Sequence, residues 1–210
     1  FFRGEYFAET NNPAKAKEYY ALASRVGAQI DIIQEMLGIV YQKNENIDES
    51  IQTYLNALKL NPHSAEAYNN LGAAYSKKGM LEEAKKSYET ALEINPRLMS
   101  VYSNIASIHY VKGEYEKAVQ IYLKAASLDA READYVGLAM SYMKLGLKDK
   151  AEEAVKLEMA YNPGSERAYY TYGNLLLELK KFPEAMEAYK KVLEMNPAND
   201  RVYNNIGVIY

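Results

Sequence analysis

The chain repeats one pattern of bulky and small residues at an interval of 34 positions, as from Tyr68 to Tyr102. The stretch 65–98 shows the pattern most completely, with two sets of residues at helical spacing: Tyr68, Leu71, Gly72 and Tyr75, then Ala84, Tyr88 and Ala91. Residues three and four positions apart share one face of a helix. Gly79 separates the two sets, and Asn95-Pro96 follows the second set, where proline disfavours a helical conformation of the residue before it. This stretch is therefore predicted to form a helix, a turn and an antiparallel helix.

Shifting the pattern along the chain predicts five full repeats, at 31–64, 65–98, 99–131, 132–165 and 166–199. Residues 1–30 read as a truncated repeat, and residues 200–210 as the first helix of another. A single helix pair cannot cover its own apolar face, so stacking of neighbouring repeats has to bury it. The hydrophobic content of 49% is consistent with such a continuous core. The sequence predicts an all-α fold.

The spacing of Tyr68, Leu71-Gly72, Tyr75, Ala84, Tyr88 and Pro96 resembles the tetratricopeptide repeat. This resemblance implies an α-α superhelix, a right-handed solenoid of antiparallel helix pairs in which all the repeats form one domain. It also implies a concave groove lined by the first helix of each repeat.

Three repeats depart from the pattern. In 31–64, Asn44 is interpreted as replacing the glycine of the turn. Asp129-Ala130 stands where other repeats have Asn-Pro, which predicts a different turn there. In 132–165 Glu158 occupies a position that is Ala or Val elsewhere, so the second helix of this repeat is expected to be degenerate. A buried unpaired carboxylate is costly, so Glu158 is expected either to reach water by local distortion or to pair with a hydroxyl or cation, with a functional role left open.

No residue pattern indicates catalysis. The chain has no cysteine and only two histidines, His63 and His109, which lie in different repeats. It contains no metalloprotease helix, nucleophile elbow, phosphate-binding glycine loop or dinucleotide fingerprint. We therefore expect no catalytic, metal or cofactor site in these residues, while a catalytic domain elsewhere in a larger protein stays open.

Charge and hydropathy limit the partners and the location. The net charge of -3, with Lys and Glu interspersed, disfavours nucleic acid. No apolar run approaches the roughly 18 residues of a membrane span. The absence of cysteine favours the cytoplasm without fixing the compartment. The chain lacks an initiator Met and stops after one helix of a repeat, which predicts an excised fragment able to self-associate through its ends.

The resemblance implies which first-helix positions face the groove, and two features appear there. First, Asn70, Asn104 and Asn205 share one position of the repeat, and an amide offers both a donor and an acceptor to a peptide backbone. A similar asparagine ladder occurs in the repeat arms of O-linked N-acetylglucosamine transferases, although Met36, Gly137 and Thr171 interrupt it here.

Second, apolar residues of three consecutive repeats are expected to form one patch beside Asn174: Tyr110, Val111, Val136, Met140, Met143, Tyr170 and Leu177. Methionine adapts to varied shapes, so the patch is a candidate surface for an apolar or amphipathic segment. The alternative is ordinary packing between repeats. In the early repeats, Glu35, Met36 and Ile39 replace the cations with which repeat co-chaperones hold acidic chaperone tails.

The sequence thus predicts a non-enzymatic scaffold that binds a peptide or partner protein in a concave groove. The alternatives are a substrate-targeting arm of a larger enzyme, such as a glycosyltransferase of the O-GlcNAc type, and a self-assembling scaffold.

Overall fold

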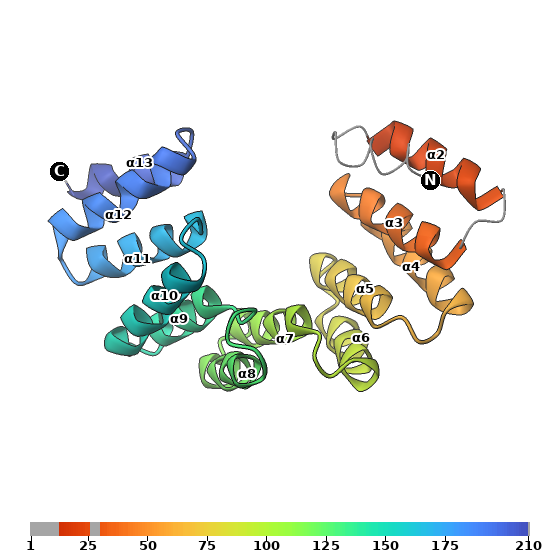
Figure 1. Cartoon of the computed structure of the whole chain (residues 1–210), viewed down its shortest axis with the longest axis horizontal. Coiled ribbons are helices and arrows are strands. Elements are labelled where there is room, and N and C mark those ends of the chain that lie inside the picture. The colour runs from red at the N-terminus through yellow and green to blue at the C-terminus, as the bar shows by residue number, and fades with distance from the viewer. Residues whose placement is uncertain (1–12, 26–29, 210) are drawn as a thin grey trace. The chain divides into compact units, whose positions relative to one another are not determined.

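The computed structural model describes residues 13–25 and 30–209, and within these residues every regular element is a helix. In chain order the helices are α2 (Pro13–Arg25), α3 (Ile30–Lys43), α4 (Ile47–Leu60), α5 (Ala65–Lys77), α6 (Leu81–Ile94), α7 (Met99–Val111), α8 (Tyr115–Leu128), α9 (Tyr135–Lys144), α10 (Lys148–Tyr161), α11 (Glu166–Glu178), α12 (Phe182–Met195) and α13 (Asp200–Ile209) (Figure 1). The all-α prediction is confirmed.

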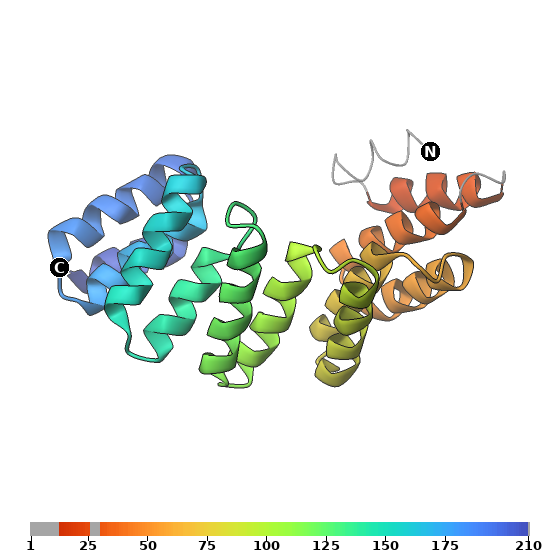
Figure 2. The same ribbon diagram turned by 60° about the horizontal axis from the view of Figure 1, so that its bottom comes forward.

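The chain forms two compact units, Phe1–Asn104 and Ile105–Tyr210, with the division inside α7. In the first unit α3 packs on α4 and α5 on α6, while α4–α5 contacts join these two pairs and α2 adds to α3 (Figure 2). In the second unit α9 packs on α10 and α11 on α12, and α10–α11 contacts join the pairs. The first helices α9, α11 and α13 also contact one another in succession. Each unit is a stack of antiparallel helix pairs, as the repeat pattern predicts.

A glycine and a tyrosine fix the distance between the two helices of a repeat. A Cβ built on Gly72 of α5 would lie only 2.6 Å from the ring of Tyr88 on α6, so nothing larger than hydrogen fits there. Tyr88 is itself almost fully buried. The same arrangement pairs Gly38 with Tyr54 and Gly173 with Tyr189. The recurring glycine therefore allows a bulky ring to fill the space between the helices.

The turn between the helices of a repeat places one residue in the left-handed region. This residue is Gly79, Gly113 or Gly146 in three repeats, but Glu45 (φ 63°) and Lys180 (φ 58°) in the other two. The interpretation of Asn44 as the replacement for the turn glycine is wrong by one position. The Asn44 side chain instead donates to the backbone oxygen of Val40 at 2.7 Å and caps the last turn of α3.

The repeat 132–165 is irregular in the length of its first helix. Helix α10 has 14 residues, like the second helices of the other repeats, so Glu158 does not shorten it, and the degenerate character of this helix stays a prediction. Helix α9 has only 10 residues. It starts late because Asp129 accepts backbone hydrogen bonds from Arg131 (2.8 Å) and Glu132, which extends the preceding turn. Asp134 then caps α9 by accepting from the Gly137 amide at 2.8 Å.

The Glu158 carboxylate is half-buried and lies near the Ser165 hydroxyl and the Tyr135 backbone. Burial raises its pKa, and nearby Asp134 adds to this effect, while Arg167 opposes it. The Ser165 hydroxyl, which also caps α11, and Arg167 both favour the charged form of this carboxylate, and its pairing stays a prediction.

At the two ends, residues 1–12 and 26–29 of the predicted truncated repeat, and Tyr210, lie outside the described residues. Pro13 begins α2, and Pro183 lies in the first turn of α12, where the proline nitrogen needs no helical hydrogen bond. Tyr203 and Val208 of α13 are exposed. Self-association through the ends stays a prediction.

Candidate functional site

The second unit contains an open cavity of about 770 Å³ between the first helices of its repeats. Its lining combines apolar, amide and charged side chains: Tyr110, Met140, Met143, Lys144, Arg167, Tyr170, Thr171, Asn174, Leu177, Glu178, Arg201 and Asn205. Most of the site residues expected from the sequence lie in this one place, namely Tyr110, Met140, Met143, Tyr170, Asn174, Leu177 and Asn205.

Half-buried apolar side chains form the floor of the cavity. Met140 and Met143 project from α9, and Leu177 from α11. Tyr110 packs edge-on against Tyr115 with ring centroids 5.3 Å apart, which fixes the position of one aromatic wall. The apolar part of the cavity therefore combines a wall made by the fixed Tyr110 ring with a floor of methionines that adapt to the shape of a ligand.

Two asparagines on neighbouring helices form a locked amide pair, Asn174 of α11 and Asn205 of α13. Asn205 Nδ2 donates to Asn174 Oδ1 at 2.8 Å and to the hydroxyl oxygen of Tyr189 at 3.2 Å. The Tyr189 hydroxyl in turn donates to Asn174 Oδ1 at 2.8 Å. Burial raises the pKa of Tyr189 to about 12, so the hydroxyl keeps its proton at neutral pH.

This network uses one half of each amide and leaves the other half for a ligand. The contacts involve Asn205 Nδ2 as donor and Asn174 Oδ1 as acceptor, together with the Tyr189 hydroxyl. What remains at the cavity is a donor, Asn174 Nδ2, beside an acceptor, Asn205 Oδ1. In an extended peptide the backbone N–H and C=O of one residue point to the same side and form the complementary pair.

The charged residues lie at the ends of the lining helices. Arg167 is the second residue of α11 and Arg201 the second residue of α13, while Lys144 ends α9 and Glu178 ends α11. The Arg167 guanidinium donates to Asp134 Oδ1 at 3.0 Å. Glu178 lies 3.8 Å from the ammonium group of Lys148.

Four of the expected site residues lie elsewhere. Val136 is 1% exposed and packs in the core, so the prediction that it faces the groove is wrong. Val111 is 74% exposed at the end of α7 and does not line the cavity. Asn70 and Asn104 are half-buried in the first unit, where Asn104 Nδ2 donates to Asn69 Oδ1 at 2.9 Å.

The charged residues of the lining and Thr171 are not among the site residues predicted from the sequence. Arg167 and Lys144 do occupy positions that the repeat pattern assigns to the groove, so that signal was available. Arg201 follows Arg167 by 34 residues, at the same position of the repeat. The choice of apolar and amide residues alone left these cations out.

The family models identify the repeat directly. Two tetratricopeptide repeat models match residues 65–98 and 100–132, and a further TPR repeat model matches 38–79 and 173–210. The chain is a tetratricopeptide repeat protein. A comparison with curated protein sequences finds no significant match.

Solved structures share the fold of this tetratricopeptide repeat protein at low sequence identity. The APC/C hetero-tetramer Cut9-Hcn1 matches with a TM-score of 0.82 and 15% identity over 98% of this chain, which spans only 41% of that chain. TTC0263, a thermophilic TPR protein of Thermus thermophilus, matches with a TM-score of 0.72 and 22% identity, over 85% of this chain and 98% of that one. YrrB, described as a TPR protein with an unusual peptide-binding site, matches with a TM-score of 0.57 and 20% identity, over 90% and 98% of the two chains. Tetratricopeptide repeat proteins generally act as protein-interaction scaffolds, and this is the class of function that the fold supports.

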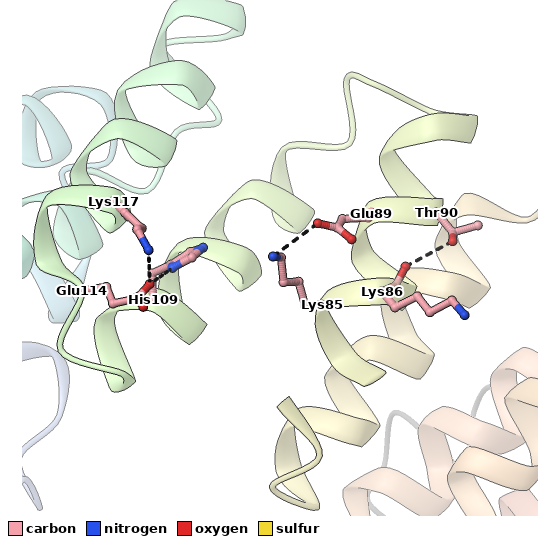
Figure 3. A network of polar contacts seen from close by, with 7 residues as sticks. All are labelled: Lys85, Lys86, Glu89, Thr90, His109, Glu114 and Lys117. Carbon is pink, nitrogen blue, oxygen red and sulfur yellow. Dashed lines mark hydrogen bonds and ion pairs between the residues drawn. The ribbon is translucent and has the colours of Figure 1, made fainter. Parts of the chain in front are cut away.

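A polar cluster around His109 connects the helices α7 and α8. His109 Nδ1 lies 2.6 Å from Glu114 Oε2, and the Lys117 ammonium donates to the same oxygen at 3.1 Å (Figure 3). These hydrogen bonds lower the pKa of Glu114 and tie the end of α7 to the start of α8. Within 13–25 and 30–209, His, Asp and Glu side chains form no group suited to a metal ion. Of the helices in the described part of the chain, none combines the length and hydropathy needed to cross a bilayer.

Proposed function

We propose that this tetratricopeptide repeat protein binds an extended segment of a partner protein in the cavity of its second unit. The observation that carries the proposal is the locked amide pair, Asn174 and Asn205, directly beside the apolar floor. The amides supply hydrogen bonds to a peptide backbone, and the floor accepts its side chains. YrrB, with the same fold, is described as having a peptide-binding site of its own.

The amide pair favours a peptide over a small apolar ligand. Buried or half-buried polar groups need hydrogen-bond partners, and an apolar molecule in the cavity would cover Asn174 Nδ2 and Asn205 Oδ1 without satisfying them. An extended peptide satisfies both with the backbone N–H and C=O of one residue. A targeting arm of a larger enzyme would use the same contacts, so the activity to test is binding.

The test is selection of a random heptapeptide library displayed on phage against the immobilised chain. Enriched peptides are then synthesised and titrated against Met140→Glu, which places a charge on the apolar floor. Val111→Glu makes the same kind of change at a site outside the cavity and serves as the matched control. We expect at least about tenfold weaker binding for Met140→Glu, because burying the new carboxylate is costly, and unchanged binding for Val111→Glu. Failure to enrich any peptide, or equal binding by the two variants, would contradict the proposal.

A further inference from the structure

We infer that the bound segment carries an acidic side chain next to its apolar residues. Arg201 binds this acid at the end of the cavity where helices α11 and α13 begin, which we call the arginine edge. This inference rests on the proposed function and adds the chemistry of the partner. Three cations, Lys144, Arg167 and Arg201, line the cavity against the single carboxylate of Glu178. The whole chain has a net charge of -3, so the cavity is positive against the overall charge of the molecule.

The cations differ in how far other groups already neutralise them. Arg167 is shared with Asp134 and lies in the field of Glu158. In contrast, no carboxylate of the described residues lies within ion-pair distance of Arg201 or Lys144. The positive charge available to a ligand is therefore greatest at these two side chains.

A second, smaller cavity of about 300 Å³ marks the arginine edge as a place with room for a side chain. Its lining shares Arg167, Tyr170 and Arg201 with the larger cavity and adds Glu166 and Asn199. The Glu166 carboxylate also faces this edge, but it accepts hydrogen bonds from the Asn199 amide at 2.8 Å and from Asn196 at 3.2 Å. Glu166 is thus satisfied within the protein, whereas the Arg201 guanidinium keeps its planar set of donors, a geometry that suits a carboxylate.

Helix geometry sets the length and direction of the segment. Helix α11 has 13 residues, so its two ends lie about 20 Å apart at 1.5 Å per residue. An extended peptide covers this distance with about six residues. A segment of this length, with its acid at Arg201, would place the backbone N–H and C=O of one residue at Asn174 and Asn205 and apolar side chains over Leu177 and Met140.

The displayed heptapeptide library tests this inference when wild type and Arg201→Glu are selected in parallel. Wild type is expected to enrich peptides with Asp or Glu next to apolar residues, and Arg201→Glu to lose this preference. A synthetic acidic peptide selected on wild type should bind Arg201→Glu about tenfold or more weakly, because a charge-assisted hydrogen bond is replaced by repulsion. Its affinity for wild type should also fall as the salt concentration rises.

Lys190→Glu on α12 is the matched control. Lys190 is exposed and does not line the cavity, so this substitution makes the same charge reversal at a distant site. It should leave the acidic preference and the affinity unchanged. Arg201→Gln, which removes the charge without reversing it, keeps the test valid if Arg201→Glu disturbs α13, and circular dichroism reports whether each variant is folded.

The outcomes separate the two proposals. Peptides that depend on Met140 but show no acidic preference overturn this inference and leave the proposed function intact. An acidic preference that persists in Arg201→Glu also overturns it. If wild type enriches no peptide at all, both fail.

Discussion

The repeats 65–98 and 132–165 fill the space between their two helices with different residues. In the first, Gly72 faces the ring of Tyr88. In the second, the same two positions hold Ala139 and Val155, and both are fully buried. A larger residue on the first helix thus accompanies a smaller one on the second. Because both pairs are closely packed, the comparison indicates that the repeat conserves the combined volume of the pair and not the identity of either residue.

The repeat 99–131 shows a third arrangement, which exceeds this combined volume and is accommodated by the following repeat. It combines Ala106 on the first helix with Tyr122 on the second, a pair that is larger in total. The ring end of Tyr122 lies against Gly137 of the following helix α9, where a Cβ would collide with it. The glycine needed by this tyrosine is therefore supplied by the next repeat.

In 166–199 the same glycine–tyrosine pair also serves the site. The close approach at Gly173 lets the Tyr189 ring lie against α11, and its hydroxyl reaches Asn174 and Asn205 at the cavity. Packing and recognition are joined here through one side chain.

The largest effect is expected from Tyr88→Ala. Removing this buried ring should lower the free energy of unfolding by about 3–5 kcal/mol, because it deletes apolar contacts and leaves a cavity between α5 and α6. Val155→Ala, the matching change in 132–165, should cost less than half as much, since it removes two methyl groups only. Urea denaturation measures both. Equal losses of unfolding free energy for the two variants would contradict the inference that the two repeats fill the space between their helices differently.

Gly72→Ala should have the next largest effect, a loss of about 1–3 kcal/mol from overpacking against Tyr88. Adding Tyr88→Val copies the Ala139–Val155 pair and should cost less than the sum of the two single changes, which a double-mutant cycle measures. The control is Gly72→Ala combined with Tyr54→Phe, a change in the neighbouring repeat that should not relieve the clash. Additive costs for Gly72→Ala and Tyr88→Val would contradict the idea of a conserved combined volume.

A coupling of about 1 kcal/mol is expected between Gly137 and Tyr122. Gly137→Ala should be relieved by Tyr122→Val and not by Val155→Ala, although Val155 is on the second helix of the same repeat as Gly137. Thermal unfolding of the single and double variants gives the coupling. Relief by Val155→Ala instead would place the close contact within the repeat and not between repeats.

The fold could be predicted from the sequence because the small and bulky residues that pack between the helices recur at a fixed spacing. The spacing of Gly72, Tyr88 and their counterparts depends on contacts between helices a fixed number of residues apart. Val136 was misplaced because the repeat pattern assigns a position to the groove face but does not show how far neighbouring side chains cover it, and the structure packs Val136 in the core. The amide pair was expected only in part, since its fixed orientation depends on the Tyr189 hydroxyl, which reaches the site from a second helix.

The smallest effect concerns the turns, where the repeats differ in the residue that occupies the one left-handed backbone position. Glu45 adopts φ 63° where Gly79 adopts φ 81°, and side chains other than glycine pay a steric cost in this region. Glu45→Gly should therefore raise the free energy of unfolding by up to about 1 kcal/mol. The greater freedom of glycine in the unfolded chain reduces this gain. Gly79→Ala should lower the free energy of unfolding by a similar amount.

Asn44→Gly is the informative comparison, because Asn44 was the residue that the sequence pattern assigned to this turn. It should be destabilising, since it removes the 2.7 Å hydrogen bond to Val40 without relieving a left-handed residue. A stabilising Asn44→Gly together with a destabilising Glu45→Gly would return the turn to the position predicted from the sequence.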